Sequence, residues 1–130
     1  MTMDKTYIDE LLKYGEHIAL ECKKAEGGVP KSIWETYSAF ANTNGGTIIL
    51  GVEEDFQADN WDDRFSVLGV HNPENIVKDF WNTINSDKVN ACILKDENVQ
   101  IVEYDEQVNI VVIQVPQAAY NIKPVFINGN

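Results

Sequence analysis

Residues 42–46 have the composition of a turn that could bind an anion. They read Asn-Thr-Asn-Gly-Gly, and consecutive backbone N–H groups in such a glycine-rich turn can form a concave anion site. The side chains of Asn42 and Asn44 add amide donors that could hold a phosphate or a base edge. The same residues also suit the end of a helix, because Gly45 and Gly46 tolerate the positive φ of a tight entry into a strand. The sequence leaves both interpretations open, a phosphate contact and a structural turn.

Three lysines could supply the positive charge that a phosphate contact at this turn needs. Lys23 and Lys24 are adjacent, and Lys31 follows shortly after them. Their help matters because a turn that follows a helix lies at the negative end of the helix dipole, which repels phosphate. Neighbouring residues of a strand point to opposite faces, so Lys23 and Lys24 need not form one patch. The predicted nucleic-acid contacts are Lys23, Lys24, Lys31, Asn42, Asn44, Gly45 and Gly46.

Three glutamates indicate a different chemistry as an alternative. Glu16 and Glu21 belong to one predicted strand, and Glu53 follows another. If the two strands are neighbours, their carboxylates could hold Mg²⁺ or Mn²⁺, whose bound water could cleave a phosphodiester. Glu16 and Glu21 are five residues apart, so they face opposite ways unless a bulge reorients Glu16. The alternative catalytic and metal residues are therefore Glu16, Glu21 and Glu53, and the competing interpretation is a set of solvated acids. Outside this alternative no cofactor is expected.

The segment 30–52 must position most of these residues. Its first part predicts an amphipathic helix from Pro30 to near Asn44, with a buried face that consists of Ile33, Trp34, Tyr37, Phe40 and Ala41. Residues 47–52 follow as a short β-branched run that is apolar on both faces. Such a run is typical of a strand in the middle of a covered sheet.

The remaining pattern predicts the elements that pack against this unit. Helices are expected at residues 4–14 and 72–85. Strands are expected at 16–24, at 99–104 and 108–115 as a hairpin, and at 124–127 as an edge strand, while 53–64 should be a surface loop. Together these elements predict an α+β fold, with a mixed β-sheet of about four to six strands packed with two to three helices.

Composition limits the range of functions. The chain has 130 residues and a net charge of −11, which indicates one acidic domain of ordinary size. Because nucleic-acid affinity comes largely from Lys and Arg, this acidity argues against strong autonomous DNA binding but leaves room for a local basic strip. No apolar run approaches the roughly 20 residues of a membrane span and no signal peptide is visible, so a cytoplasmic protein is predicted. Cys22 and Cys92 are predicted to be reduced and buried.

Several of these residues occur in a pattern that resembles a known family. The pattern comprises Glu16, Leu-Glu-Cys-Lys at 20–23, Ala-Phe-Ala-Asn-Thr at 39–43, Gly-Gly at 45–46 and Ile-Leu-Gly-Val at 49–52. It resembles the Schlafen-type AlbA-like domain. The resemblance implies a DNA-binding domain of the kind found at the N-terminus of bacterial transcriptional regulators and of RecG-related helicase proteins. It also implies that residues 1–130 are a single AlbA-like domain, an N-terminal part of a longer protein with further C-terminal domains.

Three functions are expected as alternatives. The favoured one is a non-enzymatic module that contacts backbone phosphate, with weak or partner-assisted affinity for nucleic acid. The second is the metal-dependent nuclease, since the resemblance extends to animal Schlafen proteins, in which the same fold forms part of a nuclease with clustered carboxylates. The third is a protein–protein interaction or dimerisation domain, which the acidic net charge favours. A homo-oligomer is compatible with this third function, and no membrane partner is expected.

Overall fold

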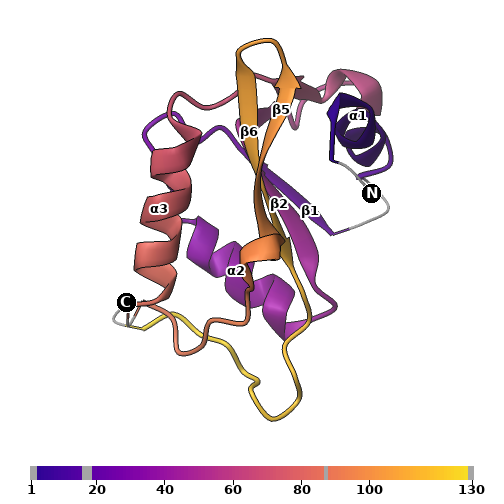
Figure 1. The fold of residues 1–130 in the computed structure, drawn as a ribbon. Helices are drawn as coiled ribbons and strands as arrows, with labels where there is room; N and C mark the ends of the chain where they lie inside the picture. Colours follow the sequence, from indigo (N-terminus) through magenta and orange to yellow (C-terminus); the bar gives the residue numbers. More distant parts are fainter. Residues whose placement is uncertain (1–2, 16–18, 87, 129–130) are drawn as a thin grey trace.

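The central β-sheet is mixed and four-stranded in the computed structural model, which describes residues 3–15, 19–86 and 88–128 (Figure 1). Its strands are β1 (Leu20–Lys23), β2 (Gly46–Leu50), β5 (Val99–Asp105) and β6 (Val108–Val115), in the spatial order β1-β2-β6-β5. Strands β1 and β2 are parallel, whereas the pairs β2–β6 and β5–β6 are antiparallel. Strand β2 thus has a hydrogen-bonded neighbour on each side, as its apolar sequence predicts.

Two helices cover one face of this sheet, α2 (Ile33–Asn42) and α3 (Pro73–Ile84). Ile48 of β2 points toward them and shares a core with Trp34 of α2 and Phe80 of α3. The rings of Trp34 and Phe80 stack with their centroids 5.2 Å apart. The aromatic face predicted for the central helix is therefore the surface that joins the two helices to the sheet.

The opposite face is covered by α1 (Lys5–Lys13) and by a small two-stranded sheet of β3 (Val52–Glu54) and β4 (Phe65–Val67). Successive strand residues alternate between faces, so Ile49 lies on this side and packs in one cluster with Ile8 of α1. The central sheet is consequently buried on both sides, and Figure 1 shows α1 on the side away from α2 and α3.

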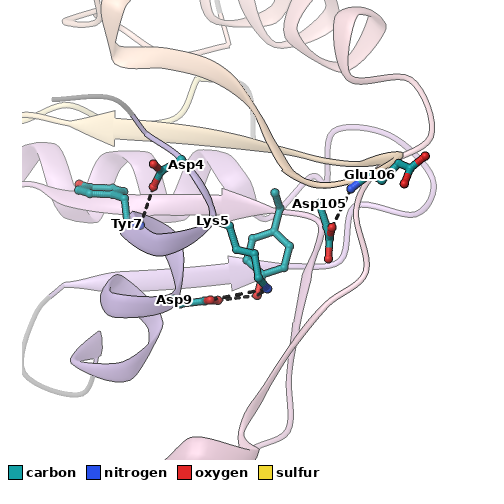
Figure 2. A network of polar contacts seen from close by, with 7 residues as sticks. Asp4, Lys5, Tyr7, Asp9, Asp105 and Glu106 are labelled. Atoms are coloured by element: carbon teal, nitrogen blue, oxygen red, sulfur yellow. Dashed lines mark hydrogen bonds and ion pairs between the residues drawn. The ribbon is translucent and has the colours of Figure 1, made fainter.

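A polar network fastens α1 to strand β5 (Figure 2). Tyr104 donates a hydrogen bond to Asp9, while Lys5 Nζ donates to the Tyr104 hydroxyl at 3.1 Å and lies 3.7 Å from the Asp9 carboxylate. Burial and the hydrogen bond to Asp9 raise the pKa of Tyr104, so this hydroxyl remains a donor. At the start of α1, Asp4 accepts a hydrogen bond from the Tyr7 N–H at 3.0 Å. These contacts fix how α1 lies on the sheet.

Most of the predicted elements, and the α+β class, are confirmed. The helices predicted at 4–14, 30–44 and 72–85 correspond to α1, α2 and α3, and the predicted hairpin is β5–β6. The strand predicted at 16–24 is described from Leu20 onward, because residues 16–18 lie outside the described part of the chain. Among the described helices, none has the length and apolar content that crossing a bilayer requires.

Three expectations were wrong in detail. Residues 53–64 are not only a loop, because Gly51, with a φ of 106°, turns the chain away from the central sheet and residues 52–54 pair with β4 instead. Residues 124–127 are not a strand of the sheet, since side-chain amides hold this backbone in place of a neighbouring strand, as described below. Cys92 is exposed, whereas Cys22 is buried as predicted.

Substitution of Gly45 by alanine is expected to destabilise the protein. Gly45 has a φ of 82°, and a Cβ there would lie 2.6 Å from the Val115 carbonyl oxygen. Strain of this kind costs about 1–3 kcal/mol before the clash is counted. Gly27→Ala is the matched control, because nothing lies within 4 Å of its added Cβ. Urea unfolding should show a clear loss of unfolding free energy for Gly45→Ala alone; equal stabilities would contradict the assigned turn.

The two cysteines are expected to differ in reactivity. Burial raises the pKa of the Cys22 thiol to about 12, and the nearby Glu54 and Glu21 act in the same direction. Because the thiolate is the reactive species, Cys22 should be inert at pH 8 while the exposed Cys92 reacts. A thiol-specific chromogenic disulfide should therefore modify one thiol in the native protein and two in denaturant. A Cys92→Ser variant that still reacts in its native state would contradict this assignment.

Candidate nucleic-acid interface

Residues 120–127, here called the 120–127 segment, begin with a turn at 120–122 and then pass beside helix α2, where Asn42 holds Val125. The Asn42 amide bonds the Val125 backbone twice: Nδ2 donates to the carbonyl oxygen at 2.7 Å, and Oδ1 accepts from the N–H at 2.6 Å. Ser38, one turn earlier in α2, donates to the same carbonyl at 2.7 Å. The Val125 side chain is buried in the core shared with α2. The amide thus supplies the donor and acceptor that a neighbouring strand would otherwise provide.

Asn90 holds the other edge of the same segment. Its Nδ2 donates to the Pro124 carbonyl at 3.0 Å, and its Oδ1 accepts from the Phe126 N–H at 2.7 Å. An isolated bridge between Val89 and Ile127 continues this pairing. Figure 1 shows the resulting path, in which the yellow end of the chain runs past α2 to the lower end of α3. Residues 124–127 of the segment are therefore held in place, with an asparagine on each side.

A cleft of about 270 Å³ lies at one end of this segment, beside the start of α2. We call it the Lys31 cleft, and its lining residues are Lys31, Ser32, Trp34, Glu35, Lys88 and Ile127. Lys23 Nζ donates to Ser32 Oγ at 3.0 Å, so a third ammonium group lies next to the lining. Lysines outnumber acids in this lining by two to one, which is unusual on so acidic a chain.

A second cleft, of about 450 Å³, lies toward the other end of the segment. We call it the Tyr120 cleft, and Asn42, Tyr120, Lys123 and Pro124 line it. Tyr120 is 94% exposed and Phe126, further along the segment, is 51% exposed. The segment therefore presents two aromatic rings to solvent together with one lysine.

The charge of the chain is distributed unevenly around these clefts. None of the 21 acidic residues follows Glu106, and Lys123 is the only charged side chain in residues 107–130. Among the described residues, no carboxylate lies within 4.0 Å of Lys31, Lys88 or Lys123. By contrast, Arg64 is paired with Glu54 at 2.6 Å on the face that carries α1. The lysines that line the two clefts thus have no carboxylate within 4.0 Å among the described residues, although Glu35 also lines the Lys31 cleft.

Two of the three lysines predicted from the sequence meet at this surface. Lys31 lines the first cleft, and Lys23 reaches the same place through Ser32, with Glu21 at 3.8 Å. Lys24 points elsewhere, because its Nζ lies 2.9 Å from Glu53 and 3.2 Å from a second glutamate. The hydrogen bonds to these carboxylates raise the pKa of Lys24. Lys24 is consequently part of a separate ion-pair group.

The amides of the predicted anion turn are engaged differently from one another. Both polar atoms of the Asn42 side chain bond the Val125 backbone, so its oxygen and one of its two amide N–H groups are engaged while the segment is in place. Asn44 is exposed. Its predicted contact with nucleic acid stays a prediction.

The two adjacent glycines of that turn lie so close to neighbouring residues that a side chain would not fit at either position. The Gly45 N–H donates to the Phe40 carbonyl oxygen at 2.8 Å, which leaves it unavailable to an anion. Gly46 begins β2 opposite Val115, and a Cβ on it would lie 2.6 Å from the Phe40 ring. The geometry favours the structural interpretation of both glycines.

Sequence reasoning missed Lys88, Tyr120 and Lys123. Lys88 and Lys31 are far apart in the sequence, and only the pairing of residues 88–90 with the 120–127 segment brings them to one cleft. A signal for the other two was present in the composition, since residues 107–130 lack acids altogether in a chain of net charge −11.

The predicted carboxylate group is only partly described. Glu16 lies outside the described residues. Glu21 lies 3.8 Å from Lys23, and Glu53 lies 2.9 Å from Lys24, so the two carboxylates are held by different lysines. Within the described ranges, no group of three or more acidic, histidine or cysteine side chains is arranged to hold a metal ion. The nuclease alternative stays a prediction.

The fold and the two clefts together define a small α+β domain. The domain is acidic overall, and its 120–127 segment carries a lysine and exposed aromatic side chains. The family model described as Schlafen, AlbA_2 matches residues 16–126, and the chain belongs to this family. A solved structure similar to it is the solution NMR structure of the N-terminal domain of a RecG-related protein from Nitrosomonas europaea, whose name links it to ATP-dependent DNA helicases. The two share 26% sequence identity at a TM-score of 0.76, over 99% of this chain and 83% of that one. No curated protein matches the chain.

Loss of the Asn42 amide is expected to loosen the 120–127 segment. Asn42→Ala leaves the buried Val125 N–H without a partner, which costs about 1–3 kcal/mol of unfolding free energy. Asn44→Ala is the matched control, because Asn44 is exposed and should change stability by less than about 0.5 kcal/mol. Chemical denaturation of both variants measures the difference. Equal stability of the two would show that the amide does not hold the segment.

Proposed function

We propose that this chain is a nucleic-acid-binding domain that contacts backbone phosphate at the Lys31 cleft. The observation that carries the proposal is the meeting of Lys31 and Lys88 at one cleft, with Lys23 beside it and no acid among residues 107–130. Lysine ammonium groups bind phosphate and release the counterions condensed around it, which is the main source of affinity for nucleic acid. Membership of the family and the similarity to a domain of a helicase-related protein support the same proposed function.

The acidic body makes this a weak or partner-assisted contact. A net charge of −11 repels a polyanion at long range, so the local cations can bind only where the opposing charges are screened. A domain of this kind suits a longer protein in which other domains supply most of the affinity. We propose DNA as the ligand and a bacterial, cytoplasmic regulator or helicase-related protein as the setting, since the neighbour's name refers to a DNA helicase.

Removal of the two cleft lysines is expected to reduce both the affinity and its salt dependence. Each phosphate contact contributes about 0.9 to the slope of log K against log salt for duplex DNA and about 0.7 for a single strand. Lys31→Ala combined with Lys88→Ala should therefore make that slope shallower by about 1.4 to 1.8. Fluorescence anisotropy of a labelled oligonucleotide, titrated at several salt concentrations, measures both quantities.

The matched control removes the same charge elsewhere. Lys13→Ala combined with Lys24→Ala takes two lysines from outside both clefts of the 120–127 segment. This pair should leave the slope nearly unchanged. If both double variants reduce binding equally, the contact is diffuse and the Lys31 cleft is not the site. An affinity that does not fall as salt rises would exclude phosphate contacts altogether.

A further inference from the structure

The Tyr120 cleft has the chemistry of a stacking site. Tyr120 is 94% exposed, so nearly the whole ring is open to a ligand, and Lys123 lines the same cleft. Single exposed aromatic residues are common on protein surfaces. Here, however, Tyr120, Ile122 and Phe126 are all exposed within one short segment, next to a lysine with no described carboxylate close by. Exposed aromatic rings interleaved with cations are the features by which proteins bind nucleic acid bases and the backbone that joins them.

A base can stack on a protein side chain only when it is not stacked inside a duplex. In a duplex, only the edges of the bases are accessible to a protein, because neighbouring base pairs cover their faces. Tyr120 therefore contributes little binding energy with a duplex and considerably more with a single strand. Stacking is also tolerant of sequence, because every base has a π-face. The cleft volume of about 450 Å³ lies within the range of small-ligand sites, which accommodates one planar base beside the ring.

The two clefts are spaced so that one strand could occupy both. The Tyr120 cleft includes Asn42 at the end of α2, and the Lys31 cleft includes Ser32 at its start. Ten residues of helix separate them, which corresponds to about 15 Å. At the roughly 3.4 Å rise of a stacked strand, this distance is about four nucleotides, and extended strands need fewer. Both clefts also border the 120–127 segment, through Lys123 at one and Ile127 at the other.

We propose that the Tyr120 cleft receives an unpaired nucleobase and that the ligand of this domain is single-stranded nucleic acid. In this arrangement the base stacks on Tyr120, Lys123 faces the adjoining phosphate, and a phosphate a few nucleotides away lies in the Lys31 cleft. The inference rests on the proposed function, because it assigns a second contact to the same ligand. It adds a preference for unpaired strands that the lysines alone would not produce.

The test compares single-stranded and duplex ligands. The probes are fluorescein-labelled oligothymidylate of about 12 nucleotides, within the range of known single-strand sites, and its duplex with oligoadenylate. The wild-type domain should bind the single strand more tightly. Tyr120→Ala should weaken single-strand binding by roughly 5- to 150-fold, the range for loss of one stacked base, and leave duplex binding unchanged. Tyr120→Phe keeps the aromatic face and should retain the preference.

The possible failures are distinguishable. If Tyr120→Ala binds the single strand as tightly as wild type while the Lys31→Ala, Lys88→Ala variant does not, the stacking site is wrong and the phosphate contact stands. If the wild-type domain binds neither probe at low salt, the proposed function fails and the stacking site with it. If the wild-type domain forms dimers in light scattering that Tyr120→Ala abolishes, with no loss of oligonucleotide binding, the segment is a self-association surface and the inference is overturned. Because Tyr120 is so exposed, its substitution should leave thermal unfolding unchanged.

Discussion

The candidate surface depends on the hydrogen bonds that satisfy the backbone around Val125. A buried backbone N–H or carbonyl without a hydrogen-bond partner lowers the free energy of unfolding by about as much as several surface contacts raise it. The backbone around Val125 therefore needs hydrogen-bond partners. Asn42 provides that pairing from α2, and Asn90 provides it from the opposite edge. Because both partners are side chains, the segment between them can be extended and fixed without joining the sheet. The backbone of residues 124–126 is then held at a defined place beside α2.

This constraint also links the core to the clefts. Helix α2 packs its aromatic face against the sheet through Trp34 and Tyr37, and it uses Ser38 and Asn42 to hold the 120–127 segment. The same helix therefore positions the start of one cleft and the end of the other. Tyr37 extends the arrangement, since its hydroxyl donates to the Ala91 carbonyl at 2.8 Å and so fixes the chain that carries Asn90. A change in α2 would be transmitted to both clefts.

Hydrophobic periodicity was sufficient to predict the helices, the β5–β6 hairpin and the interior position of β2, because each is set by local apolar patterns. It was insufficient for the 120–127 segment, whose partners Asn42 and Asn90 are distant in sequence and polar. The turn at Gly45 shows the same limit: its glycines signal a positive φ, but only the close approach of Val115 shows that the turn serves packing. Of the predicted lysines, the sequence identified Lys31 and Lys23, while Lys88 could be found only from the tertiary pairing of residues 88–90.

The longest acid-rich stretch of the chain lies across the sheet from the clefts, which reduces its repulsion of an anion bound there. The acid-rich residues 53–63 comprise the end of β3 and most of its connection to β4, and these strands pack with α1 on one face, whereas α2 and the 120–127 segment belong to the other face. Layers packed on a sheet are about 10 Å apart, so charges on the two surfaces are separated by at least that distance. The Debye length at physiological ionic strength is about 8 Å, and repulsion from the far face is largely screened there. A lysine in direct contact with phosphate is screened much less, so under the proposed function the local cations would decide the interaction at the clefts.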